Sequence, residues 1–221
     1  QPVLNKPVMK VLTAIPGVNQ LLFKKIRNTL MEAFGGNIRE IVMGGAALNP
    51  DVEKWFKKIG IPYTVGYGMT EAAPLMAYED WDKFAPKSCG KAIDFVEVRI
   101  DSEDPYNVVG EIQAKGTNIM SGYYKNEDAT RAAFTKDGWM NTGDLGLLDK
   151  EGNIYIKGRS KNMILSPNGQ NIYPEEIEAV INNLPYVIES IVISRGTALV
   201  GLVYFDAEKL AENNLVAAEY G

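Results

Sequence analysis

"IREIVMGGAALNPDVEKWFKKIGIPYTVGYGMTE", residues 38–71, sets the expected fold class of this chain. Two short β-rich runs, Ile38–Met43 and Ile61–Val65, flank a helical pattern. Asn49 is a typical N-cap, and Pro50 suits the first position of the helix. A strand, a helix and a strand of this length predict a right-handed crossover between two parallel strands. The stretch therefore predicts an α/β fold.

Both expected strands run into glycines. Gly44-Gly45 follows the first strand, and Gly66-Tyr67-Gly68 follows the second. Because parallel neighbours end at the same edge of a sheet, we expect these two loops to lie side by side. Glycines also simply turn a chain, and for either loop alone this alternative is equally good. Together the two loops predict a ligand site, since open α/β sheets bind ligands at that edge.

The chain divides into three expected units. Apolar residues at helical spacing from Asn19 to Gly35 place a further helix upstream, so residues 1–78 predict a parallel α/β subdomain. Residues 79–158 predict an antiparallel, β-barrel-like subdomain, because short β-rich segments alternate with turn residues. Its expected strands are Val96–Ile100, Gly110–Lys115 and Asn153–Ile156. The charged run Lys157–Asn162 is the expected linker to the third unit.

Residues 159–221 predict a small, incomplete α+β C-terminal domain. A helix is expected from Pro174, with Glu175 and Glu176 in its first turn, where the helix dipole favours anions. Its expected apolar face consists of Ile177, Val180, Ile181 and Leu184. The elements expected after it are strands Ile188–Ser194 and Ala198–Phe205 and a helix beyond Asp206.

The composition excludes several kinds of chemistry. The 221 residues contain no histidine, which removes Ser-His-Asp and Cys-His catalysis and most zinc sites. The single cysteine, Cys89, rules out an intrachain disulfide and fits a reducing compartment such as the cytoplasm. A net charge of −5 does not indicate a basic surface for binding nucleic acid. No apolar run approaches the roughly 20 residues of a membrane-spanning helix.

Polar residues near the glycine edge suit a metal–phosphate site. Glu71 would repel a bare phosphate, but Mg²⁺ binds one or two carboxylates together with substrate phosphates. Thr70 would then donate to a phosphate or carboxylate oxygen; alternatively, it caps the next helix and Glu71 is solvated. Asp144 is expected in a turn, where it caps its own backbone or accepts two sugar hydroxyls. Arg159 and Lys161 are either solvated charges or cations that meet a nucleotide.

Five ordered motifs resemble the adenylate-forming superfamily of acyl- and aryl-CoA synthetases, peptide-synthetase adenylation domains and firefly luciferase. The motifs are "GGAAL" (44–48), "GYGMTE" (66–71), "GEIQAKGTNIMSGYYKN" (110–126), "WMNTGDLG" (139–146) and "GRSKNMILSPNGQNIYPEEIE" (158–178). The amino-acid sequences of the third and fifth motifs most resemble those of long-chain fatty acid–CoA ligases. Two alternatives stay open: a peptide-synthetase-type adenylation domain, and a nucleotide- or acyl-binding module without turnover.

The resemblance implies roles for the matching residues. The implied ATP/AMP-binding positions are Gly45, Ala46, Ala47, Tyr67, Gly68, Met69, Thr70, Asp144 and Arg159. Of these, Tyr67 would stack on adenine and Asp144 would bind the ribose hydroxyls. Thr70 and Glu71 are the implied catalytic residues, and Glu71 is also the implied Mg²⁺ ligand. The remaining implied positions are Lys161 as hinge, Gly169 near coenzyme A, and Gly66 and Gly68 beside the acyl pocket.

The implied reaction has two steps. A carboxylate, implied to be that of a long-chain fatty acid, attacks the α-phosphate of ATP, and the thiol of coenzyme A then displaces AMP. The resemblance thus implies ATP, Mg²⁺ and coenzyme A, and it leaves peripheral membrane contact open. The phosphate loop and C-terminal lysine of the family are not found in these 221 residues. We therefore expect this chain to be a fragment that does not itself adenylate.

Overall fold

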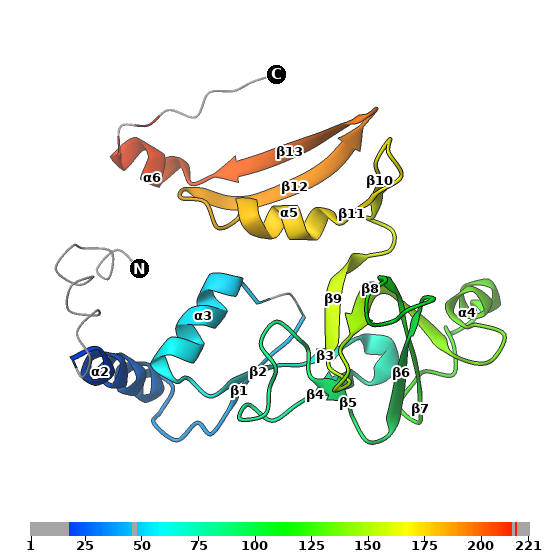
Figure 1. Ribbon diagram of the computed structural model, residues 1–221, viewed down its shortest axis with the longest axis horizontal. Helices are drawn as coiled ribbons and strands as arrows, with labels where there is room; N and C mark the ends of the chain where they lie inside the picture. The colour runs from blue at the N-terminus through cyan, green and yellow to red at the C-terminus, as the bar shows by residue number, and fades with distance from the viewer. Residues whose placement is uncertain (1–17, 46–47, 214, 216–221) are drawn as a thin grey trace.

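The computed structural model describes residues 18–45, 48–213 and 215. In Figure 1 these residues form a larger body, which ends with strand β9 (Ile154–Arg159), and an upper unit, which comprises the described residues after that strand. None of the helices in the described residues is long and apolar enough to cross a membrane.

The first part of the body confirms the predicted parallel unit. Helix α2 (Val18–Ala33) precedes strand β1 (Ile41–Met43), helix α3 (Pro50–Ile59) and strand β2 (Tyr63–Val65). β1 and β2 pair in parallel, although both are shorter than the sequence predicts. The side chain of Asn49 caps α3 by accepting from the backbone N–H groups of Asp51 and Val52, at 2.9 and 3.2 Å. The helix ends at Gly60, whose φ of 75° lies in the left-handed region.

The segment after β2 is more ordered than the predicted loop. Strands β3 (Tyr67–Gly68), β4 (Leu75–Tyr78) and β5 (Lys91–Ala92) form a three-stranded antiparallel sheet, with a short 3₁₀ helix η1 (Thr70–Ala72) between β3 and β4. This sheet uses residues on both sides of position 78, where the sequence predicts a subdomain boundary. That boundary stays a prediction.

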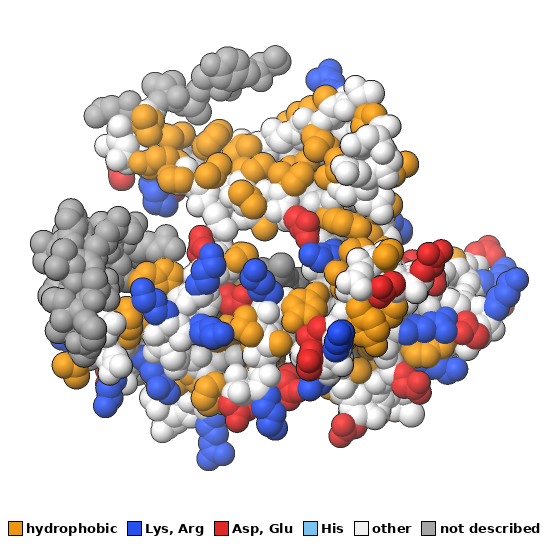
Figure 2. All heavy atoms as spheres, viewed as in Figure 1, with side chains coloured by type: hydrophobic (Ala, Val, Ile, Leu, Met, Phe, Trp, Pro, Cys, Tyr) orange, Lys and Arg blue, Asp and Glu red, His pale blue; other side chains and the backbone are white. Residues whose placement is uncertain are grey.

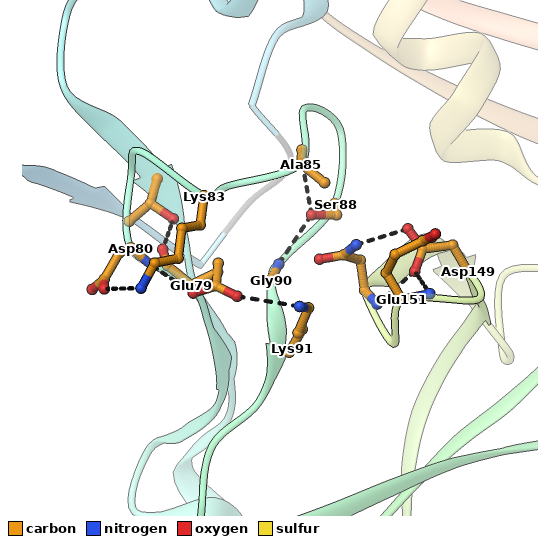
Figure 3. Close-up of polar contacts among 11 residues, drawn as sticks. Glu79, Asp80, Lys83, Ala85, Ser88, Gly90, Lys91, Asp149 and Glu151 are labelled. Carbon is orange, nitrogen blue, oxygen red and sulfur yellow. Dashed lines mark hydrogen bonds and ion pairs between the residues drawn. The ribbon is translucent and has the colours of Figure 1, made fainter.

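Polar contacts hold the connection between β4 and β5 (Figure 3). Glu79 and Lys91 form an ion pair at 3.6 Å across the connection. The Ser88 hydroxyl donates to the carbonyl of Ala85 at 2.6 Å and accepts from the N–H of Gly90 at 3.1 Å. These bonds tie an otherwise irregular segment to the three-stranded sheet.

A four-stranded antiparallel sheet makes up the rest of the body. Its strands, in spatial order, are β6 (Val96–Asp101), β7 (Gly110–Gly116), β8 (Met140–Leu148) and β9 (Ile154–Arg159). The predicted antiparallel strands are therefore present, but the sheet is open rather than barrel-like, because β6 and β9 are its two edges and do not pair in the described residues. β9 also takes in Lys157–Arg159, so the expected linker begins as a strand. Helix α4 (Glu127–Ala133), not expected from the sequence, lies between β7 and β8.

The upper unit has the predicted α+β pattern. Strands β10 (Ile164–Leu165) and β11 (Asn171–Ile172) precede helix α5 (Pro174–Ile181), the antiparallel pair β12 (Val187–Arg195) and β13 (Ala198–Phe205), and helix α6 (Ala207–Glu212). Helix α5 ends at Ile181, so Leu184 of the predicted apolar face lies beyond the helix and is 55% exposed. The rest of that face is only partly covered, since Val180 is 67% exposed. One face of the β12–β13 pair is also open: Ile191 and Leu202, paired across it, are 52% and 56% exposed (Figure 2).

Candidate functional site

The two glycine loops meet at the carboxyl edge of the parallel strands. The N–H of Gly66, just after β2, donates to the carbonyl of Met43 at the end of β1, at 2.8 Å. A Cβ added to Gly44 would lie 3.4 Å from the carbonyl oxygen of Gly66. The prediction that these loops lie side by side is therefore confirmed. Ala46 and Ala47, implied to line adenine, lie outside the described residues.

A buried carboxylate is hydrogen-bonded to Tyr67, the residue between Gly66 and Gly68. Asp144 on β8 is 7% exposed. Its Oδ2 accepts from the hydroxyl of Tyr67 on β3 at 2.7 Å, and its Oδ1 lies 3.0 Å from Nε of Arg159 on β9. Tyr67 and Arg159, which lie 77 and 15 positions from Asp144 in the sequence, thus both contact its carboxylate. Arg159 is 57% exposed, so its cationic end stays open to solvent.

Asp144 does not lie in a turn, and that prediction was wrong. β8 continues through "NTGDLG" and pairs with both neighbours, with Asp144 directly opposite Arg159 of β9. The turn-forming residues are accommodated by a bulge: the β7–β8 register shifts between Glu111 and Gln113, and Gly143 adopts a φ of 75°. The turn-favouring residues of "NTGDLG" therefore form a bulge within β8, and they do not end the strand.

The charge of Asp144 affects two nearby protons. Burial, and then the neighbouring Asp144, raise the pKa of the Tyr67 phenol far above its usual value, so this hydroxyl remains a donor. Burial, with a smaller contribution from Asp144, also raises the pKa of Cys89 to about 11. The Cys89 thiol therefore stays protonated at neutral pH and is a poor nucleophile. Tyr67 is buried, with 6% of its surface exposed. The contact that the structure shows for its side chain is the hydrogen bond from its hydroxyl to Asp144.

Thr70 and Glu71 begin η1, close in sequence to Tyr67. Thr70 is exposed, and η1 has no side-chain cap, so the alternative in which Thr70 caps the next helix is wrong. Glu71 is partly buried, and its Oε1 accepts from the hydroxyl of Tyr123 at 3.0 Å. Sequence reasoning missed Tyr123, because its partner lies 52 residues away.

The donor set around Glu71 suits Mg²⁺ bound together with phosphates. Among the described residues, no group of three or more Asp, Glu, Cys or His side chains is placed to hold a metal by itself. Mg²⁺ usually takes one or two carboxylates and completes its octahedron with water and substrate phosphates. A single partly buried carboxylate, preceded in sequence by the exposed Thr70, fits that pattern and does not fit a metal cage formed by protein alone.

Gly68 is required by the fold itself. A Cβ at this position would lie 1.9 Å from the carbonyl oxygen of Pro74, because β3 and β4 approach closely there. We expect Gly68→Ala to lower the free energy of unfolding by about 1–3 kcal/mol through this overlap. Gly44→Ala is the matched control, since its Cβ would meet only an ordinary contact at 3.4 Å. Equal denaturation midpoints for the two variants would contradict the steric explanation.

Three further implied positions, Lys161, Gly169 and Gly66, form no hydrogen bond or ion pair with Asp144 in the described residues. Lys161 is exposed in the turn after β9. Gly169, with a φ of 81°, lies in the turn between β10 and β11, and no atom lies within 4 Å of where its Cβ would be. At Gly66 an added Cβ would lie 3.2 Å from the Leu75 side chain. The structure therefore brings together Tyr67, Asp144 and Arg159, and separately Glu71 and Tyr123, but it gives Lys161 and Gly169 no contact with either group.

The chain is similar to known AMP-forming ligases. The family model described as AMP-binding enzyme matches residues 5–124, more than half of the chain. The 2-succinylbenzoate–CoA ligase of Bacillus cytotoxicus is 34% identical over 96% of this chain and 48% of that protein. The long-chain-fatty-acid–CoA ligase 4 of Saccharomyces cerevisiae is 37% identical over 76% of this chain and 24% of that protein. The chain thus spans about half of one relative and a quarter of the other.

The fold of this chain also matches a solved structure of a coenzyme A synthetase. The O-succinylbenzoate coenzyme A synthetase (MenE) of Bacillus subtilis, in complex with ATP and magnesium ion, matches with a TM-score of 0.68 and 29% identity. The match covers 86% of this chain and 44% of that chain. The family model, the sequence relatives and this fold agree with one another, and the chain belongs to the AMP-binding enzyme family.

Proposed function

We propose that this chain contributes part of the adenylate site of an AMP-forming acid–CoA ligase. The observation that carries the proposal is the buried Asp144, held by Arg159 and by Tyr67, which directly follows Gly66 of the glycine edge. A carboxylate fixed by two partners is suited to accept the two ribose hydroxyls of a nucleotide. The exposed end of Arg159 then lies near the phosphates, where its positive charge offsets theirs.

Thr70 and Glu71 complete the proposed site on the phosphate side. Thr70 donates to an oxygen of the reacting phosphate or carboxylate, and Glu71 would hold Mg²⁺. When bound, Mg²⁺ offsets the negative charge that develops on the phosphates. The protein aligns the acid with the α-phosphate of ATP so that acyl-AMP and pyrophosphate form, and the thiol of coenzyme A then displaces AMP. No protein nucleophile is needed, which is consistent with the absence of histidine and the protonated Cys89.

The proposed acid is a long-chain fatty acid. The sequence of the "SPNGQNIYPEEIE" motif (166–178) and the 37% identity to a yeast long-chain fatty acid–CoA ligase support this choice. The second candidate is an aryl acid such as 2-succinylbenzoate, which the similarity over 96% of the chain favours. In the same proposal, Lys161 is the hinge of the C-terminal domain, Gly169 approaches coenzyme A, and Gly66 and Gly68 border the acyl pocket.

Pyrophosphate release by the full-length protein separates the two acids. We expect release with ATP, Mg²⁺ and saturated fatty acids, rising with chain length, and acyl-CoA formation when coenzyme A is added. Faster release with 2-succinylbenzoate than with any fatty acid would favour the aryl candidate. Binding of ATP without pyrophosphate release from any acid would favour a module without turnover. Acyl transfer to a carrier protein but not to coenzyme A would favour the peptide-synthetase type.

A further inference from the structure

Glu71 is held at two points by one distant segment of the chain, residues 118–123. The carbonyl of Glu71 accepts from the N–H of Met120 at 2.8 Å. Its carboxylate Oε1 accepts from the hydroxyl of Tyr123 at 3.0 Å. Both the backbone and the charged end of Glu71 are thus fixed by a segment that lies between β7 and α4.

The same segment fixes the rest of η1. The side-chain amide of Asn118 donates to the carbonyls of Ala72 and Leu75, at 2.6 and 2.9 Å. The Ala72 carbonyl lies at the end of η1, and the Leu75 carbonyl lies at the start of β4. Residues 118–123 therefore hold η1 against the start of β4, and they define where the carboxylate of Glu71 can lie.

Tyr123 is itself fixed in place. Its backbone N–H donates to the hydroxyl of Thr130 at 2.9 Å, and that hydroxyl donates to the carbonyl of Asn126 at 2.8 Å. Gly122, with a φ of 150°, packs so closely on Thr130 that an added Cβ would lie 2.7 Å from its methyl group. The first turn of α4 thus anchors the residue whose hydroxyl reaches Glu71.

Packing does not explain the position of the Tyr123 ring. Tyr123 is 41% exposed and lines an open groove of about 580 Å³ together with Ser121, Lys125 and Thr130. An exposed hydrogen bond contributes little to stability. Its effect on the geometry of a carboxylate is larger, because a bond from a fixed donor to Oε1 restricts the rotation of the carboxylate and leaves Oε2 free.

We propose that Tyr123 is a positioning residue, which orients the Glu71 carboxylate so that Oε2 meets the Mg²⁺ that accompanies ATP. The proposal rests on the proposed role of Glu71 as the metal ligand. It assigns to Tyr123 no contact with substrate and no proton transfer. Loss of the phenol hydroxyl leaves the Glu71 carboxylate in place but free to rotate. We therefore expect a lower affinity for Mg²⁺ and an unchanged rate at saturating Mg²⁺.

The test compares Tyr123→Phe with Tyr124→Phe in the full-length protein. Tyr124 is the matched control, because it is 88% exposed and its ring contacts Lys125 and not Glu71. In Tyr123→Phe we expect the Mg²⁺ concentration for half-maximal pyrophosphate release to rise about tenfold, with kcat at saturating Mg²⁺ little changed. Mn²⁺ binding in the presence of ATP, followed by electron paramagnetic resonance, should weaken by the same factor. Tyr124→Phe should match the wild type in both measurements.

Glu71→Gln separates failure of this inference from failure of the proposed site. If Glu71→Gln weakens Mn²⁺ binding but Tyr123→Phe does not, the positioning role of Tyr123 is wrong and the metal role of Glu71 stands. If Glu71→Gln leaves Mn²⁺ binding unchanged, both are wrong. An equal loss in Tyr123→Phe and Tyr124→Phe would also overturn the inference, because the effect would then not depend on the hydrogen bond to Glu71.

Discussion

In the full-length protein, the proposed function predicts that Glu71→Gln slows adenylate formation by about 10²–10³-fold at ordinary Mg²⁺ concentrations, the typical effect of removing one preorganised charge-stabilising group. The amide keeps the size of the carboxylate and one oxygen that can accept the Tyr123 hydroxyl, so the local fold is retained. It loses the negative charge that would hold Mg²⁺. The measurement is the rate of pyrophosphate release as a function of Mg²⁺ concentration.

Glu127→Gln is the matched control for this change. Glu127 lies at the start of α4, and its side chain is 91% exposed; among the described residues its one ion pair is with Arg131, at 3.7 Å. We expect wild-type Mg²⁺ dependence in this variant. Thermal unfolding of Glu71→Gln should resemble that of the wild type, since at most one exposed hydrogen bond of about 1 kcal/mol is weakened. Wild-type adenylation by Glu71→Gln would show that Glu71 does not bind the metal.

Asp144→Asn should weaken AMP binding by about 100-fold. An amide has one acceptor oxygen where the carboxylate has two, so when that oxygen also accepts the Tyr67 hydroxyl it has one lone pair left for the ribose. It also lacks the charge that strengthens both ribose bonds by roughly 1.5 kcal/mol each. The Asn oxygen can still accept the Tyr67 hydroxyl, so the buried phenol keeps a partner and the protein stays folded. Calorimetric titration of AMP into the full-length protein gives the affinity directly.

Asp137→Asn provides the comparison for a lost Asp–Arg pair. Asp137 pairs with Arg99 at 2.8 Å, but both side chains are exposed, Arg99 by 39% and Asp137 by 58%. We expect its AMP affinity to equal that of the wild type. If Asp137→Asn and Asp144→Asn weakened AMP binding equally, the loss would reflect general electrostatics and not a ribose contact.

The parallel unit was predictable because its signals are local. Asn49, Pro50 and Gly60 mark the two ends of α3 by backbone chemistry that acts within a few residues, and the crossover rule then fixes the parallel pairing. The meeting of Gly44 with Gly66 follows from that pairing alone. The C-terminal strands were found for a similar reason, since each is a continuous β-rich run.

The errors arose where tertiary context overrides local preference. The "NTGD" residues favour a turn, yet pairing with β7 and β9 keeps them in β8 and moves the irregularity into a bulge. The contact between Tyr123 and Glu71 joins residues 52 positions apart, and no local pattern specifies it. Likewise the hydrogen bond from Tyr67 to Asp144 spans 77 positions, so sequence alone suggested the carboxylate but not the partner that holds it.

A structure of the full-length protein with a non-hydrolysable acyl-adenylate analogue tests the central claim most directly. We predict both ribose hydroxyls within hydrogen-bond distance of Asp144, about 2.5–3.0 Å, with the adenosine beside the Gly44–Gly66 edge. The phosphate mimic should lie on the side of Thr70 and Arg159. An analogue bound elsewhere, or bound at this edge with its ribose away from Asp144, would contradict the account.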